Sequence, residues 1–388
     1  MNLQERIARR QAARGQTGII LDRDVLSPTV HREEPVGRGS VLEQLLDAVE
    51  PTFGRGFPKS FAVVGPPGSG TSAVITALFR SLTTTLGETT GTIGTTTRAG
   101  SGEPTTWFIY VDARRVSSAF AFYRTVLSIM TADSVPTGGV GTEELRDRLV
   151  SHLEPHNRRA VIAIDHHDEP ETITADRVQE LLDPVAQHTT VVPVGQSPPP
   201  TWEDTIIEVP PYRRHELTDI LTERVSSGLA TGAIEHHHVR EVAEWADGNA
   251  HNALTALFTA ATLASQEDQP ALKSTHLERG KADVPDECIH LDRTLSLPET
   301  RQQVLCTLLA LESAGIKTCQ QPIRELAAAI AERSALTAGT VKRFLYELAD
   351  KDVLTRVPLE VGGSGRRPST IEPRFPPIAF QTLTPVNE

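Results

Sequence analysis

The sequence predicts an α/β protein with a parallel sheet, followed by a helical region and a C-terminal winged-helix domain. Three observations lead to this prediction: a strand–turn–helix unit at 61–73, apolar strands that alternate with helical segments up to residue 209, and three helices followed by two strands near the C-terminus. Strands that alternate with helices favour a parallel sheet, with its ligand at the carboxyl ends of the strands.

The strand–turn–helix unit reads FAVVGPPGSGTSA and has the pattern of a phosphate-binding P-loop. Gly65 and Gly70 let the backbone direct N–H groups toward a phosphate, and the following helix adds its positive end. The lysine that should reach the β- and γ-phosphates is replaced by Thr71, whereas Ser72 keeps the hydroxyl that would contact Mg²⁺. The alternative interpretation is a tight turn that only closes a strand on a helix.

Composition limits the function classes. At 388 residues and 38% hydrophobic residues, the chain is long enough for two or three folded domains. The net charge of −12 argues against a protein that coats nucleic acid by charge alone. No apolar run approaches the length of a membrane span and the N-terminus has no signal-peptide core, so we expect a cytoplasmic protein without a membrane partner. Three cysteines without paired spacing predict neither disulfides nor zinc.

In the first half of the chain, the arginine-rich residues 5–14 (Arg6, Arg9, Arg10 and Arg14) are interpreted as a solvated tail, with a helical arm as the alternative. Helices are expected from Ser40, from Ser72 to about Leu82, and over 119–130 and 142–153. Residues 83–106 are rich in Thr, Gly and Ser and predict a flexible insertion. The strands are expected at 107–112, 160–165, 189–194 and 205–209.

The strand AVIAID ends in Asp165, where P-loop proteins place a carboxylate that helps to hold magnesium. His166, His167 and Asp168 follow it, but adjacent residues at a strand end point in opposite directions, so we interpret them as a loop rather than a metal cluster. His236, His237 and His238 fan around the start of a helix and are interpreted as exposed polar residues.

The second half is helical at 214–227, 235–246 and 251–265, and a polar link is expected at 266–288. Helices at 299–313, 321–332 and 337–351 then precede two strands joined by a glycine-arginine turn. Three helices followed by a hairpin are the layout of a winged helix-turn-helix, whose third helix enters the major groove.

Six strings together resemble one family, the archaeal origin-recognition and cell-division-control replication initiators of the AAA+ class. They occur in the family's order: DVLSP (24–28), GPPGSGTS (65–72), the strand with Asp165, PPYRRHELTDILTER (210–224), ADGNAHNAL (246–254) and SLPETRQQVL (296–305). With 6 lysines against 32 arginines and abundant acidic residues, the composition also resembles that of proteins from salt-loving archaea.

The resemblance implies a basic tail at 1–17, an AAA+ P-loop domain at 18–209, a helical lid at 210–285 and a winged helix at 290–383. It implies ATP or ADP with Mg²⁺ as cofactor, double-stranded origin DNA as partner, a nucleoid-associated location, and contacts with other initiator subunits or a replicative helicase. By this resemblance the nucleotide-binding residues are Gly65, Gly68, Ser69, Gly70, Thr71, Ser72, Tyr212 and Arg224, and the magnesium contacts are Ser72 and Asp165.

The chain departs from the family pattern at three positions that matter for chemistry. Thr71 replaces the P-loop lysine, His166 replaces the glutamate after Asp165, and His251 replaces the lid arginine. Gln196 is the nearest amide to the expected sensor asparagine, and 197–210 contains no arginine. Losing the lysine weakens nucleotide binding by roughly 10- to 150-fold. Losing the general base and the arginine finger costs about 10²–10⁴ and 10³–10⁵ in rate, so we expect negligible hydrolysis.

For DNA, the expected reading helix at 337–351 buries Val341, Phe344, Leu345 and Leu348. The residues left to contact DNA are Thr340, Lys342, Arg343 and Tyr346, together with Arg366 and Arg367 at the hairpin tip. Solvated surface cations are the alternative for each. The predicted function is a replication-initiator-like DNA-binding protein; a transcriptional regulator derived from the same fold and an active ATPase with non-standard residues remain the alternatives.

Overall fold

The computed structural model describes residues 18–54, 56–91, 105–131, 134–136, 138–155, 157–359 and 367–384. They form two compact units: one is His31–Pro211, and the other joins the segment ending at Val30 to the chain from Tyr212 onward. The arginine-rich residues 5–14 lie outside the described residues. Within the described parts, no helix is both long and apolar enough to cross a membrane.

The His31–Pro211 unit is built on a five-stranded sheet in the order β2-β3-β4-β1-β5. Each neighbouring pair is parallel, which confirms the predicted fold class. The chain crosses over between strands, as expected for strands that alternate with helices. The strands are β1 (Phe61–Val64), β2 (Thr105–Asp112), β3 (Arg158–Asp165), β4 (Thr189–Gly195) and β5 (Thr205–Glu208).

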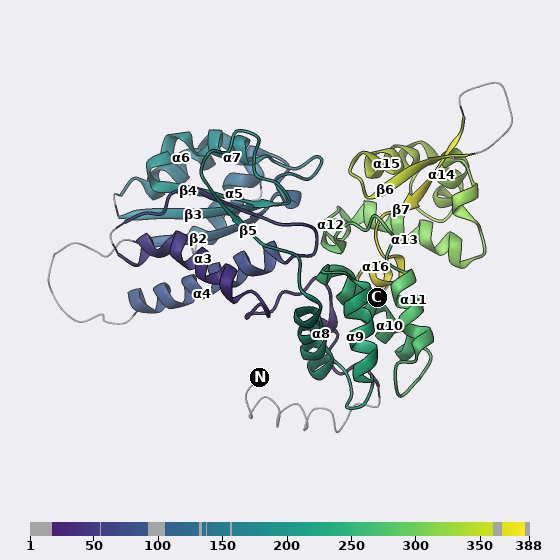
Figure 1. Ribbon diagram of the computed structural model, residues 1–388. Helices are drawn as coiled ribbons and strands as arrows, with labels where there is room; N and C mark the ends of the chain where they lie inside the picture. The colour runs from purple at the N-terminus through teal and green to yellow at the C-terminus, as the bar shows by residue number, and fades with distance from the viewer. Residues whose placement is uncertain are drawn as a thin grey trace. The chain divides into compact units, whose positions relative to one another are not determined.

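Helices cover both faces of this sheet (Figure 1). On one face lie α3 (Gly39–Val49) and α4 (Thr71–Gly91); on the other lie α5 (Ala119–Met130), α6 (Thr142–Leu153) and α7 (Ala175–Leu182). Along β3, Val161 and Ala163 pack into the α3–α4 core, whereas Ile162 and Ile164 pack into the α5–α7 core. Because strand side chains alternate, Asp165 belongs to the face that α4 covers.

The stretch expected to be a flexible insertion is helical at its start. Helix α4 continues to Gly91, so the prediction that it ends near Leu82 was wrong. The hydroxyl groups of Thr83 and Thr84 donate to the carbonyls of Phe79 and Arg80, one turn earlier, at 2.7 and 3.0 Å. These bonds satisfy the threonine side chains within the helix. Residues 92–104 of the stretch lie outside the described residues.

In the other unit, four helices follow Tyr212: α8 (Arg214–Gly228), α9 (His236–Trp245), α10 (Ala250–Gln266) and α11 (Ser274–Ala282). Helix α11 lies in the expected polar link, so that prediction was wrong. It packs closely, since a Cβ on Gly280 would lie 2.3 Å from the carbonyl oxygen of Ala256. Its buried residues are Leu277, His276 and Gly280, a set without the apolar stripe that helix prediction needs.

The C-terminal part of this unit contains α12 (Leu291–Leu295), α13 (Glu299–Ser313), α14 (Ile323–Ala331), α15 (Ala338–Asp350), β6 (Leu354–Pro358), β7 (Ser369–Pro373) and α16 (Pro377–Leu383). Strands β6 and β7 pair antiparallel, as predicted for the wing. Helices α12 and α16 were not predicted. The Asp283 carboxylate accepts hydrogen bonds from the N–H groups of Ile378 and Ala379 and from the hydroxyl of Thr259, which fastens α16 to α10.

Candidate functional site

The P-loop connects β1 to α4, and its glycines have distinct roles. Gly68 and Gly70 have φ of 75° and 86°, a left-handed conformation that favours glycine. A Cβ on Gly65 would lie 2.5 Å from both Ser69 Oγ and the Val209 carbonyl oxygen. The close approach of the β5 end to the loop therefore requires glycine at position 65.

The backbone of the loop forms an anion cradle. The Ser69 N–H donates to the Pro66 carbonyl at 3.0 Å and the Gly65 N–H to the Gly195 carbonyl at 3.1 Å, so these two groups shape the loop. Thr71 is the first residue of α4, and the N–H groups of a helix's first turn have no partner within the helix. The Ser69 Oγ is buried and has no hydrogen-bond partner among the described residues. The loop thus offers neutral donors to a phosphate.

Thr71 supplies no charge. Its Cγ2 lies 3.2 Å from where a Cβ on Gly65 would be, so its methyl group rests against the base of the loop. Arg38, which the sequence analysis missed, is a cation that binds the loop backbone. Its Nε and Nη2 donate to the Ser69 carbonyl at 3.0 and 2.6 Å, and Nη2 also donates to the Pro210 carbonyl at 2.8 Å. Arg38 is only 2% exposed, so it braces the loop from inside.

Asp165 is enclosed at the carboxyl end of β3. Its Oδ2 accepts a hydrogen bond from the Tyr110 hydroxyl at 2.7 Å, and its Oδ1 accepts one from the His166 N–H at 2.9 Å. Burial, followed by the nearby Asp165 carboxylate, raises the pKa of Tyr110 well above its usual value, so the phenol stays a donor. The sequence marked Tyr110 only as part of an apolar strand.

His166 is directed into the same cluster. Its φ of 61° turns the chain, and its ring lies between two carboxylates, with Nε2 at 3.5 Å from Asp165 Oδ2 and Nδ1 at 3.3 Å from Glu169 Oε1. Burial lowers the pKa of His166, but the Asp165 and Glu169 carboxylates outweigh this effect and the net shift is upward. The imidazolium that this favours is a poor proton acceptor.

Asp168 serves the adjoining loop. Its Oδ2 accepts hydrogen bonds from the N–H groups of Gln196 and Ser197 at 2.7 and 2.9 Å. A Cβ on Gly195 would lie 2.4 Å from Asp168 Oδ1, so glycine is needed there. Asp168 therefore ties the chain after β3 to the chain after β4, and Gln196 takes part through its backbone. His166 and Asp168 contact different partners, as expected for a loop.

The two lid residues belong to the other unit. Arg224 is 5% exposed, and its Nη1 and Nη2 donate to the carbonyls of Val25 and Val30, both at 2.7 Å. It holds the segment around α2 (Arg23–Leu26), which contains most of the DVLSP string. Tyr212 is buried, and its N–H donates to the Gly248 carbonyl at 3.1 Å. Arg224 thus has a structural task, and a nucleotide contact by either residue stays a prediction.

His251 points into its own unit. Its Nε2 accepts a hydrogen bond from the Leu291 N–H at 3.0 Å, and its ring lies 4.2 Å from that of His290. Burial, followed by the neighbouring His290, holds the pKa of His251 well below its usual value. The neutral imidazole joins α10 to the start of α12.

Helix α15 and strand β6 form an exposed basic surface. Val341, Phe344, Leu345 and Leu348 are buried, as the helical spacing predicted. Lys342 and Arg343 are exposed, whereas Thr340 and Tyr346 are half-buried. Two cations lie near the Tyr346 ring, with Lys342 Nζ at 5.9 Å and Arg356 Cζ at 4.9 Å from its centroid. We call Lys342, Arg343, Tyr346 and Arg356 the α15–β6 surface.

The sequence analysis missed Arg356, because the sequence of a predicted wing strand does not show which helix its arginine will face. At the hairpin tip, Arg367 is exposed, and Arg366 lies outside the described residues.

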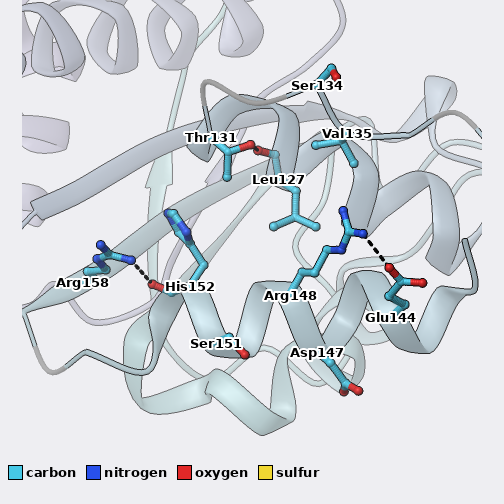
Figure 2. A pocket seen from close by; sticks show the side chains of 10 residues that line it. All are labelled: Leu127, Thr131, Ser134, Val135, Glu144, Asp147, Arg148, Ser151, His152 and Arg158. Carbon is cyan, nitrogen blue, oxygen red and sulfur yellow. Dashed lines mark hydrogen bonds and ion pairs between the residues drawn. The ribbon is translucent and has the colours of Figure 1, made fainter.

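A pocket of about 690 Å³ lies in the α/β unit. Figure 2 shows its lining, which comes from α5, α6, the chain between these helices and the first residue of β3. Arg158 is at the amino end of β3, whereas the P-loop follows the carboxyl end of β1. Arg148 donates to Glu144 and Arg158 to the His152 carbonyl, so both arginines are engaged by neighbours. The pocket is separate from the phosphate cradle.

Comparison with known proteins defines the class of this chain. Residues 34–194 match the family described as AAA ATPase domain, and residues 218–282 match the Cdc6 AAA+ ATPase-type lid domain. The parallel sheet with its P-loop, followed by a helical lid, is therefore that of an AAA+ protein.

The particular family follows from the lid and from the relatives. An ORC1-type DNA replication protein of Methanoregula boonei is 20% identical, over 87% of this chain and 78% of its own length. ORC1-type DNA replication protein 10 of Halobacterium salinarum is 21% identical, over 77% and 73%. The structure of the Aeropyrum pernix ORC1 protein in complex with DNA has 20% identity and a TM-score of 0.62, covering 94% of this chain and 96% of that one. The chain belongs to the archaeal origin-recognition and cell-division-control family of AAA+ replication initiators.

Proposed function

We propose that this chain acts in replication initiation by binding double-stranded DNA through the α15–β6 surface, while its AAA+ module binds adenine nucleotide weakly and does not hydrolyse it. Two solved relatives support the two ligands. The Aeropyrum pernix ORC1 protein was solved in complex with DNA, and the ORC2 protein of the same organism as ADPNP-ADP complexes.

The observation that carries the DNA part is the arrangement around Tyr346. Two exposed cations from different elements, Lys342 on α15 and Arg356 on β6, lie 5.9 and 4.9 Å from the centroid of one ring. Stacking against an aromatic ring limits the motion of long side chains, so less entropy is lost when they contact DNA. Arg343 adds a third exposed cation next to them.

A binding assay with variants of the full chain tests this surface. We use a DNA duplex from a replication origin that members of this family bind. Lys342→Ala and Arg343→Ala should each weaken binding to it by about 5- to 150-fold if the two side chains contact bases. The matched control is Arg240→Ala, an exposed arginine of α9 in the lid, which should bind like the parent chain. Equal affinities for all three variants would exclude this surface as the DNA site.

Salt dependence gives a second measurement of the same interface. With a net charge of −12, the chain gains little from phosphate attraction as ionic strength rises. We expect few phosphate contacts and therefore a shallow slope of log K against log salt. A slope near −9, which corresponds to about ten phosphates, would contradict this expectation.

We expect no hydrolysis because the carboxyl ends of the strands lack groups that ATP cleavage needs. Thr71 brings no charge to the phosphates, and His166 lies between two carboxylates that raise its pKa and favour the imidazolium, which is a poor proton acceptor. The losses of base and arginine finger together exceed about 10⁵ in rate. A single-turnover assay with radiolabelled ATP should show no cleavage above background. Magnesium-dependent cleavage that Asp165→Ala abolishes would show an active ATPase instead.

An initiator and a transcriptional regulator would both bind DNA through this surface, so the chromosomal sites that the chain occupies distinguish the two functions. Chromatin immunoprecipitation of the tagged chain should enrich replication origins. Enrichment at promoters alone would identify a regulator that kept the initiator fold.

A further inference from the structure

The carboxylate of Asp165 stands where the family resemblance expects a magnesium contact, yet its surroundings are those of a buried structural acceptor. Asp165 is fully buried, and its side chain is 1% exposed. Its two oxygens already accept hydrogen bonds from the Tyr110 hydroxyl and the His166 N–H, at 2.7 and 2.9 Å. Mg²⁺ binds oxygen at about 2.0–2.1 Å in a near-octahedral shell that usually includes several waters. This enclosed carboxylate does not fit that requirement.

Strand register explains why Tyr110 reaches Asp165. Asp112 is the direct register partner of Asp165, and Tyr110 is the partner of Ala163. Tyr110 is therefore the diagonal neighbour of Asp165 on the same sheet face, a separation that long side chains can bridge. Tyr110 also packs against the core formed with α3 and α4, so its hydroxyl reaches Asp165 on the sheet face that these helices cover.

Residue 166 offers Mg²⁺ no carboxylate in place of Asp165. His166, where the family pattern has a glutamate, is turned by its φ of 61° so that its ring faces Asp165 and Glu169. Its side chain is 14% exposed. Neither residue 165 nor residue 166 therefore presents a free carboxylate oxygen to a metal ion bound with nucleotide.

The P-loop itself keeps the features that bind an anion without a metal. Gly68 and Gly70 hold the turn, α4 begins at Thr71, and the buried Ser69 Oγ is without a partner among the described residues. Backbone N–H groups and a helix N-terminus attract phosphate oxygens directly. All these donors are uncharged.

We infer that Tyr110 and His166 have closed the magnesium position of this chain, so that its P-loop takes adenine nucleotide as the metal-free anion. The inference rests on the proposed non-hydrolysing module and specifies the ligand of that site. Nucleotide affinity should then be the same in Mg²⁺ and in EDTA, and Asp165 should contribute to folding rather than to ligand binding.

The first test measures unfolding of the full chain in EDTA. If Asp165 is a structural acceptor, Asp165→Asn and Tyr110→Phe each lower the unfolding midpoint by about 2–4 °C. The double variant should lose less than the sum, because both changes remove one interaction. The matched control is Tyr123→Phe, which loses a buried hydroxyl bond to the Leu181 carbonyl on the other face of the sheet. Its effect should add to that of Asp165→Asn.

The second test uses Mn²⁺ as the probe. Electron paramagnetic resonance should detect no Mn²⁺ bound by the chain alone, and the affinity for ADP should change less than twofold between Mg²⁺ and EDTA. Tenfold tighter ADP binding in Mg²⁺ that Asp165→Asn abolishes would overturn the inference. So would an Asp165→Asn variant that is as stable as the parent in EDTA. If ADP does not bind in either condition, the nucleotide part of the proposed function fails and so does the metal-free ligand, whereas the unfolding measurements still show whether Asp165 is a structural acceptor; neither outcome bears on DNA binding.

Discussion

The carboxyl ends of the α/β strands and the α15–β6 surface both carry charged side chains, but these side chains differ in their exposure to solvent. At the sheet edge, Arg38, Asp165 and His166 are bonded to other protein groups and largely hidden from solvent. On the α15–β6 surface, Lys342 and Arg356 are exposed and lie 5.9 and 4.9 Å from the centre of the Tyr346 ring. A charged side chain can therefore serve in binding only where it is available to a ligand, whatever motif it belongs to.

The energetic reason is desolvation. A buried polar or charged group is tolerated only when protein partners replace its water, and those partners then restrict its contacts with a ligand. An exposed cation keeps its water until DNA displaces it, and then gains from the phosphate or base. The internal bonds at the sheet edge therefore favour a structural role, and the open face of the winged helix favours binding.

The largest effect is expected from Arg38→Met. It leaves the Ser69 and Pro210 carbonyls without their buried donor, at about 1–3 kcal/mol of unfolding free energy for each. Chemical denaturation of the full chain measures the loss, while DNA affinity should stay unchanged. The control is Arg80→Met on the exposed side of α4, which should change stability by less than about 0.5 kcal/mol. If the two variants are equally stable, Arg38 does not stabilise the P-loop.

A smaller effect, on binding instead of stability, is expected from Arg356→Ala. Its guanidinium lies 4.9 Å from the centre of the Tyr346 ring on an exposed strand. Loss of one phosphate contact and of the stacking should cost about 1 kcal/mol of DNA binding, or about fivefold in Kd, and lower the salt slope by about 1. Fluorescence anisotropy at several salt concentrations measures both. If Kd and slope match those of Arg240→Ala, β6 makes no DNA contact.

The smallest effect is a dependence of stability on pH that involves His251. Burial, followed by His290, lowers the pKa of this imidazole, so it stays neutral in the folded chain while the unfolded chain takes up a proton below about pH 6.5. The folded state should therefore lose stability as pH falls from about 6.5 toward the lowered pKa, and not above 6.5. Unfolding midpoints between pH 7.5 and 5 should fall less steeply for His251→Gln. The exposed His236→Gln control should follow the parent chain.

Much of the fold could be predicted because local patterns report which side of an element is buried. The apolar strand before Asp165 and the stripe at Val341, Phe344, Leu345 and Leu348 are buried as expected. Helix α11 escaped prediction because a glycine and a histidine make its contacts instead of an apolar stripe. The start of the 83–106 stretch was mistaken for a loop because threonines can satisfy their hydroxyl groups within a helix.

The parallel sheet, the glycines of the P-loop, the missing lysine at Thr71 and the cations at Lys342 and Arg343 could be read from the amino-acid sequence. The groups that enclose Asp165 and the P-loop became visible only in the folded chain. Tyr110 meets Asp165 across 55 residues of chain, and Arg38 meets Ser69 across 31. Such contacts depend on strand register and helix packing, which join residues from separate elements, whereas a sequence pattern records only the face that each element buries.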